Sequence, residues 1–251
     1  AAIIHLTDAQ HAEALEVGLP GGHVIPNGVD AARIERDALP RSAARAVLDL
    51  PPHAYVLGTI ARLDPVKKVE RLIAAMTHLP DAHLVIIGDG AERAHLQARA
   101  DVLELRERVH FVGALRDAAG YLCALDVFLS ASTREGLPLA LLEAMACGLP
   151  VVVSDIPAHL AVLGQSTQVS DDLVRMVTWL RGNPTVAADL GARNRRTVEA
   201  FSAARMVEQT AVVYLRATGR WAEMEVGPPL LGMRLTTVAR RGELPAPTWD
   251  D

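Results

Sequence analysis

Hydrophobic and polar positions follow two different periods along this chain. Short, nearly continuous apolar runs are typical of parallel strands that helices cover on both faces. They predict strands at residues 3–6, 23–25, 55–60, 83–87, 109–112, 126–129 and 150–153. Longer segments with apolar residues every three or four positions predict helices at 8–17, 41–48, 66–78, 91–105, 117–123, 137–147, 171–181, 184–199 and 202–217. This alternation predicts an α/β fold with a doubly wound, Rossmann-like parallel sheet.

Composition narrows the class of protein. Half of the residues are hydrophobic and the net charge is −5, as expected of a globular protein with a substantial core. The absence of a basic excess argues against nucleic-acid binding. No apolar run approaches the length of a membrane span, no signal peptide is visible, and the two cysteines match no metal or redox spacing. We therefore expect a cytoplasmic protein in a reducing compartment, without a transmembrane segment.

Chemically distinctive residues follow the predicted strands directly. Arg62, Gly88, Gly113 and Glu135 each come just after one of the apolar runs. In open parallel sheets, ligands bind beyond the carboxyl ends of the strands. The sequence therefore predicts that these residues converge on one rim of the sheet.

The segment from Arg134 to Pro150 carries the strongest chemical signal. Glu135 and Glu143 stand eight residues apart across a predicted loop-to-helix junction. We expect the helix to begin near Leu137 or Pro138, because proline suits a first helical turn. A helix N-terminus favours a phosphate, and from this start Glu143 lies about two turns along the helix. A diphosphate at the helix start would have a carboxylate near each side, which suits a nucleotide sugar.

This segment resembles the E-x7-E motif of retaining glycosyltransferases of the GT-B fold, family four (glycosyltransferase group 1). The common form of that motif reads E-G-L-P-x-x-L-L-E-A-M-A, and residues 135–146 match it throughout. Five other segments resemble family motifs in the same order: Val24–Asp30, Gly58–Lys68, Leu84–Gly90, Val109–Gly113 and Ala124–Phe128. The resemblance runs from about residue 20 to about residue 217. It implies the C-terminal, donor-binding domain of such an enzyme.

The resemblance also implies roles for individual residues. The substrate would be a nucleotide-diphosphate sugar, with no cofactor and no metal. Arg62 and Lys67 would neutralise charge on the leaving diphosphate, Glu143 would hold the ribose, and Glu135 the transferred sugar. The remaining donor-site residues are Gly88, Leu115, Gly136, Leu137 and Leu139, of which Leu137 and Leu139 would offer backbone N–H groups.

Lysine usage singles out one of these positions. Of the 25 lysines and arginines, only Lys67 and Lys68 are lysines. A lysine is a compact point charge and an arginine is a planar fork, so a lysine suits a narrow diphosphate site. Lys67, five residues after Arg62, is the expected phosphate ligand. Lys68 falls where the family often has glycine and is the second choice; the alternative is that both lysines are solvated residues opening a helix.

The resemblance divides the chain into three parts. Residues 1–20 correspond to the end of an acceptor-side domain, 21–217 to the donor-binding domain, and 218–251 form a tail rich in proline and glycine turns. The remainder of an N-terminal GT-B domain is not in this sequence. The chain is then either a fragment or one half of an enzyme completed by a partner chain, and we expect little transfer activity from it alone.

Residues 156–170 depart from the family pattern. Ala158 stands where the family usually has glutamate, and we predict that a final edge strand is absent. His159 is best interpreted as a bystander, and we assign no catalytic base. Two alternatives remain open: a non-catalytic GT-B-like binding subunit and a sugar-nucleotide epimerase. The sequence does not identify the base, the sugar or the acceptor.

Overall fold

A five-stranded parallel sheet forms the centre of the molecule. The computed structural model describes residues 2–219, and the predicted tail, apart from its first two residues, lies outside them. The sheet has the strand order β5-β4-β3-β6-β7, with β3 at Tyr55–Ile60, β4 at Ala82–Ile87, β5 at Val109–Gly113, β6 at Val127–Ser130 and β7 at Val151–Val153. All four pairings are parallel. The predicted α/β doubly wound fold is confirmed.

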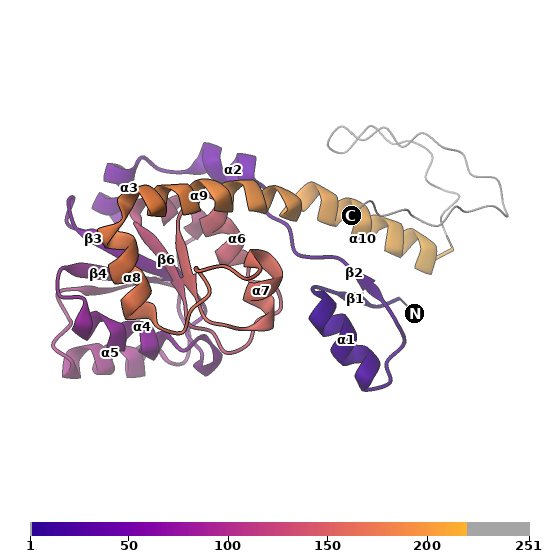
Figure 1. Ribbon diagram of the computed structural model, residues 1–251, viewed down its shortest axis with the longest axis horizontal. Coiled ribbons are helices and arrows are strands. Elements are labelled where there is room, and N and C mark those ends of the chain that lie inside the picture. The colour runs from indigo at the N-terminus through magenta and orange to yellow at the C-terminus, as the bar shows by residue number, and fades with distance from the viewer. Residues whose placement is uncertain (1, 220–251) are drawn as a thin grey trace.

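Helices cover both faces of this sheet (Figure 1). The α-helices of the main body are α2 (Ala31–Asp37), α3 (Arg41–Val47), α4 (Val69–Ala75), α5 (Arg93–Val102), α6 (Leu139–Ala146), α7 (Pro157–Leu163), α8 (Leu173–Gly182) and α9 (Pro184–Val198). Short 3-10 helices lie at Pro65–Lys67 (η1), Met76–His78 (η2), Ala118–Ala124 (η3) and Glu199–Phe201 (η4). Two helices, α2 and α7, were not predicted from the sequence.

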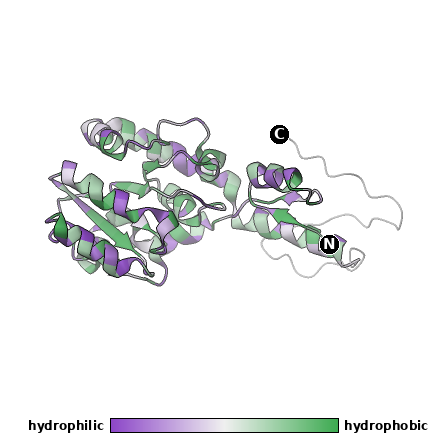
Figure 2. Ribbon diagram, turned by 90° about the horizontal axis from the view of Figure 1, so that it is seen from below, coloured by the Kyte–Doolittle hydropathy of each residue, from purple (hydrophilic) through white to green (hydrophobic). Residues whose placement is uncertain are grey.

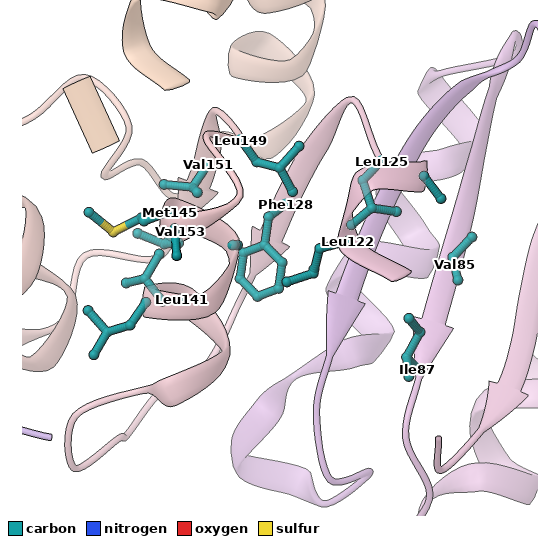
Figure 3. Packing of buried hydrophobic residues seen from close by; sticks show 14 of the residues in the cluster. Val85, Ile87, Leu122, Leu125, Phe128, Leu141, Met145, Leu149, Val151 and Val153 are labelled. Atoms are coloured by element: carbon teal, nitrogen blue, oxygen red, sulfur yellow. The ribbon is translucent and has the colours of Figure 1, made fainter. Parts of the chain in front are cut away.

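Alternate residues of each strand enter two separate cores. On β4, Val85 and Ile87 join the core under α3, η3 and α6, whereas Leu84 and Ile86 join the core under α4, α5 and α8. Figure 3 shows the first of these cores, in which Phe128 of β6 points toward Leu122 of η3. Hydropathy colouring shows apolar strands among helices of mixed character (Figure 2). Two-sided burial explains why the strands appear in the sequence as continuous apolar runs.

The predicted helix 66–78 is not continuous. It is divided into η1, α4 and η2, and the break after η1 is at Lys68, whose backbone is left-handed with φ of 49°. That conformation favours glycine, because a Cβ crowds the following carbonyl. The break turns Lys67 away from the axis of α4 and toward the carboxyl ends of the strands.

A second, smaller unit precedes the main sheet. Strand β1 (Ile4–His5) pairs in parallel with β2 (His23–Val24), and α1 (Asp8–Glu16) connects them. This two-stranded sheet lies on both sides of the predicted boundary at residue 20. Figure 1 shows it beside the main body, at the same end as α10 (Ala203–Ala217).

The chain enters and leaves the main body at one crossing, which we call the neck (residues 27–30 and 201–203). Val29 N–H donates to Phe201 O at 2.9 Å, and Ala203 N–H donates to Val29 O at 3.1 Å. A Cβ added to Gly28 would overlap the carbonyl group of Ser202. Gly28 thus permits the two segments to touch.

The far edge of the sheet agrees with the sequence prediction. Beyond β7, the described residues contain only an isolated parallel bridge between Val153 and Val169, and no further strand. Part of the expected loop is instead the unpredicted helix α7.

Candidate donor site

A pocket of about 190 Å³ opens at the carboxyl ends of β3 and β6. Its walls come from the end of β3, the end of β6, the loop that leads to α6 and the first turn of α6. The lining residues are Asn27, Thr59, Ile60, Ala61, Lys67, Phe128, Ser130, Ser132, Glu135, Leu137, Pro138, Leu139, Ala140 and Leu141. This is the rim at which ligands bind in open parallel sheets.

Lys67 and Glu135 form a close ion pair in the wall of the pocket. Lys67 Nζ lies 2.7 Å from both Glu135 Oε1 and Glu135 Oε2. The side chains are only 22% and 12% exposed, so water screens the pair weakly. The structure thus brings together two predicted site residues that are 68 positions apart.

A backbone hydrogen bond joins the loop that carries Glu135 to the segment that carries Lys67. Thr133 N–H donates to Val66 O at 2.8 Å, which fixes the β6–α6 loop against the residue before Lys67. Ser132 Oγ donates to Glu135 Oε1 at 2.7 Å. The carboxylate is therefore held from the side of its own loop as well as by the lysine.

The N-terminus of α6 faces the same pocket. Pro138 is the N-cap, and it makes no side-chain capping hydrogen bond. The first-turn N–H groups of a helix have no partner within the helix, and Leu139, Ala140 and Leu141 all line the pocket. The helix begins at Leu139, one or two residues after the predicted start near Leu137 or Pro138. Glu143 lies about one turn into the helix rather than two.

Asn27 connects the neck to this helix start. Its Nδ2 donates to Leu137 O at 2.8 Å across 110 positions of sequence. The contact fixes Leu137, two positions before α6. Asn27 itself is one of the residues that line the pocket.

Glu143 lies outside the residues that line the pocket. Its carboxylate is half-buried and, among residues 2–219, forms neither a hydrogen bond nor an ion pair. Burial without a compensating partner raises its pKa above the ordinary value. A donor group such as a ribose hydroxyl would supply the missing partner.

Arg62 is also outside the pocket lining. Its side chain is 78% exposed, and Nε donates to Asp64 Oδ2 at 2.7 Å. This guanidinium helps to lower the pKa of Asp64, against the opposing effect of burial. The side chain is long and largely free in solvent, so no packing fixes it in its present position.

Three further predicted site residues, Gly88, Gly136 and Leu115, make packing contacts outside the pocket. A Cβ on Gly88, where φ is 143°, would overlap the carbonyl oxygen of Ala61, so glycine allows the loops after β3 and β4 to approach. Gly136 lies next to Leu6 of the small N-terminal unit. Leu115 packs, partly buried, against the core under η3 and α6. None of these three lines the pocket, whereas Leu137 and Leu139 do.

Sequence reasoning missed several polar residues of the pocket wall. These are Asn27, Thr59, Ser130 and Ser132. Ser132 precedes Glu135 by three residues, a spacing that suits a local side-chain contact in a turn. Asn27 lies within Val24–Asp30, which resembles a family motif, but that resemblance implied no contact with the pocket.

The described residues offer no evident metal centre. Within residues 2–219, no three His, Cys, Asp or Glu side chains are grouped so as to hold a metal ion. No described helix is long and apolar enough to span a bilayer.

The fold and the pocket define an α/β protein with a helix start, uncapped by a side chain, at the carboxyl rim of a parallel sheet. The chain belongs to the glycosyl transferases group 1 family, whose model matches residues 40–168, about half of the chain. Its fold is that of GT-B glycosyltransferases.

Curated relatives match this chain over part of their length. The O-antigen biosynthesis glycosyltransferase WclY of Escherichia coli is 28% identical over 168 residues, which is 64% of this chain and 46% of WclY. The lipopolysaccharide core biosynthesis glycosyltransferase LpsE of Rhizobium meliloti is 40% identical over 108 residues, 43% of this chain and 32% of LpsE. The chain thus spans less than half the length of these two relatives.

Solved structures show the same fold. HepE of Anabaena, crystallised with UDP and glucose, superposes with a TM-score of 0.77 at 22% identity, covering 86% of this chain and 63% of HepE. Sucrose-phosphate synthase of Thermosynechococcus elongatus superposes with a TM-score of 0.74 at 25% identity, covering 87% of this chain and 59% of the synthase.

Proposed function

We propose that this chain binds the donor of a retaining glycosyltransferase, a nucleotide-diphosphate sugar, in the pocket at the start of α6. The observation that carries the proposal is the presence of Lys67, Glu135 and an uncapped helix N-terminus in one pocket. A cation and free N–H groups suit a diphosphate, and a carboxylate suits sugar hydroxyls. The family membership supports the same conclusion.

The Lys67–Glu135 pair holds both groups in the pocket wall. Each charge compensates for the burial of the other. When a donor binds, Lys67 turns to the diphosphate, and Glu135 accepts hydrogen bonds from the sugar. Charge that builds on the leaving diphosphate is then stabilised by Lys67 and by the N–H groups of the α6 first turn.

Arg62 and Glu143, which lie outside the pocket wall, would also contact the donor. Arg62 reaches the diphosphate by leaving Asp64, which an exposed side chain can do at little cost. Glu143 accepts from a ribose hydroxyl, which satisfies its unpaired carboxylate. Transfer proceeds with retention of configuration and without a metal or cofactor, in the cytoplasm.

The proposed activity needs a second domain. Residues 1–20 would end an acceptor-side domain and residues 21–217 would form the donor domain. An N-terminal GT-B domain, in the same polypeptide or in a partner chain, supplies the acceptor site. This chain alone then binds the donor and transfers little.

Calorimetric titration with UDP, GDP and ADP, and with their sugar conjugates, tests the proposal. We expect one nucleotide series to bind, and Lys67→Met to weaken that binding by roughly tenfold to a hundredfold, because a charge-assisted contact is lost. Lys68→Met is the matched control. It removes the same charge from the next residue, which pairs with Glu70 at 3.5 Å, and should leave the affinity within about twofold. Equal losses in both variants would contradict a specific phosphate contact.

The position of Arg62 favours one alternative, a non-catalytic binding subunit. Arg62 pairs with Asp64 and is absent from the pocket wall. Donor binding that survives Arg62→Met unchanged, together with no transfer after addition of an acceptor-side domain, would favour this alternative. The epimerase alternative gains no support from a family of glycosyl transferases.

A further inference from the structure

A buried histidine lies behind the Lys67–Glu135 pair. His159, in the first turn of α7, is 0% exposed. Its Nδ1 lies 2.8 Å from Ser154 O and 3.4 Å from Ser154 Oγ. The donor-site roles proposed above do not use this residue.

The contacts of His159 determine where its proton is. A carbonyl oxygen only accepts, so Nδ1 must carry the hydrogen that it donates to Ser154 O. Nε2 is buried and has no partner among the described residues. Protonating Nε2 would bury a charge and an unpaired N–H, and burial lowers the pKa of His159 below its ordinary value. The ring therefore stays neutral and donates through Nδ1.

Three hydrogen bonds, two of them accepted by backbone carbonyl oxygens, connect this ring to the pocket. Ser154, at the end of β7, donates from Oγ to Ser132 O at 2.5 Å. Ser132, at the end of β6, donates from its own Oγ to Glu135 Oε1 at 2.7 Å. Both serines are buried, so no water competes for these contacts. The series ends at Lys67, which Glu135 holds through both carboxylate oxygens.

We propose that His159 is a positioning residue for Glu135. Its Nδ1–H holds Ser154, Ser154 holds Ser132, and Ser132 holds the carboxylate against Lys67. His159 thereby governs recognition of the sugar of the donor rather than of its nucleotide. This assignment rests on the proposed function for the identity of the ligand, but the geometry that it describes consists of contacts within the chain itself.

Lysine scarcity gives a direct measurement of that geometry. A chain grown with ¹³C,¹⁵N-lysine contains only Lys67 and Lys68 as labelled residues, so its NMR spectrum holds one side-chain Nζ signal for each, and Lys68 is an internal reference. Glu135→Gln calibrates the shift that Lys67 shows on losing its partner. We expect His159→Leu and Ser154→Ala to shift Lys67 in the same direction.

The conservative variant His159→Asn should keep the wild-type signal of Lys67. In His159→Asn, the side-chain amide nitrogen can stand where Nδ1 stood and donate to Ser154 O, so we expect Lys67 to remain near its wild-type position. His110→Leu is the matched control, since it removes a partly buried ring at β5, away from the pocket. Ser154→Ala deletes only the hydroxyl that donates to Ser132 O and keeps the carbonyl that His159 bonds, so it tests the Ser154–Ser132 step, which the proposal requires, even if His159→Leu does not fold.

Donor titration supplies the second measurement. The ratio of nucleotide-sugar affinity to nucleotide affinity should fall by roughly tenfold in His159→Leu and Ser154→Ala, because a hydrogen bond to a charged group is misplaced. In His159→Asn the ratio should be kept. An unshifted Lys67 signal and an unchanged ratio in folded Ser154→Ala would overturn the assignment. A wild-type chain that binds no donor would instead contradict the proposed function, and the lysine spectrum would still decide this inference.

Discussion

Lys68 shows how a single residue shapes the site through its backbone. Its left-handed conformation ends η1 and lets α4 begin at Val69. An L-residue adopts this conformation at a cost of roughly 1–2 kcal/mol. The family's usual glycine at this position has the same physical reason, because a glycine pays no such cost.

Replacing Lys68 by glycine should therefore stabilise the fold. We expect the free energy of unfolding to rise by about 0.5–1 kcal/mol, since relief of the left-handed strain exceeds the added entropy of the unfolded chain. Urea denaturation measures the change. Lys68→Ala is the control, since it removes the same side chain and keeps the Cβ. A gain of equal size in both variants would mean that the side chain, and not the backbone, is responsible.

The sequence predicted individual site residues unevenly. Lys67 and Glu135 were predicted from lysine scarcity and a motif, and the structure pairs them in the pocket wall. Asn27 was missed because its partner Leu137 is 110 positions away, and no local pattern encodes such a contact. Arg62 and Glu143 match the same motifs but lie outside the pocket wall. A motif fixes the order of residues, whereas the direction of a side chain depends on its packing.

At the scale of elements, strands were more predictable than helices. The five strands of the main sheet are buried on both faces, so that their apolar runs are unambiguous. Helix α2 was missed because its seven residues, Ala31–Asp37, include only one large apolar side chain, Ile34. Helix α7 was missed because the resemblance suggested a loop there. A proline at its first position agrees with its observed start.

Two neighbouring strands carry a histidine pair that links folding to pH. His83 Nδ1 on β4 and His110 Nε2 on β5 lie 3.0 Å apart, which requires one ring to donate and the other to accept. Burial lowers the pKa of both rings. Arg108 and Arg45 lower the pKa of His83 further, while Asp49 and Glu107 partly oppose the change at His110.

Stability should therefore fall on acidification. The unfolded chain takes up protons near the ordinary value of 6.5, while the folded rings resist them. The contribution is present above pH 6.5 and is lost as pH falls toward the lowered folded pKa. We expect the free energy of unfolding, measured in urea at pH 7.5, 6.5 and 5.5, to fall less steeply in His110→Gln than in wild type.

His95→Gln is the control for this experiment. His95 is exposed on α5, so its removal should leave the wild-type slope. His159 acts in the same direction as the pair, so some slope should remain in His110→Gln. An identical slope in wild type and His110→Gln would exclude a contribution from the pair.

At the scale of the whole molecule, the neck connects the main body to the small N-terminal unit and α10. Both passes of the chain meet at Gly28 and Ser202. Asn27, one residue earlier, holds the start of α6. The crossing of the neck and the contact with the start of α6 are therefore made by adjacent residues.

Gly28→Ala should loosen this connection. The added Cβ overlaps the Ser202 carbonyl group, and crowding of this kind costs roughly 1–3 kcal/mol. We expect faster hydrogen exchange at the amides of Val29 and Ala203, which bond across the neck. Gly21→Ala is the control, because its nearest atom, His11 Nε2, is 3.8 Å away. Unchanged exchange in Gly28→Ala would mean that the neck adjusts without opening.

The neck also gives the main body a topological property. Because Val29 and Ser202 are bridged, the segment between them starts and finishes at one point in space. Because its two ends lie close together, such a segment is suited to insertion into a loop of another protein and to circular permutation. Every residue that lines the pocket, except Asn27, lies within this segment.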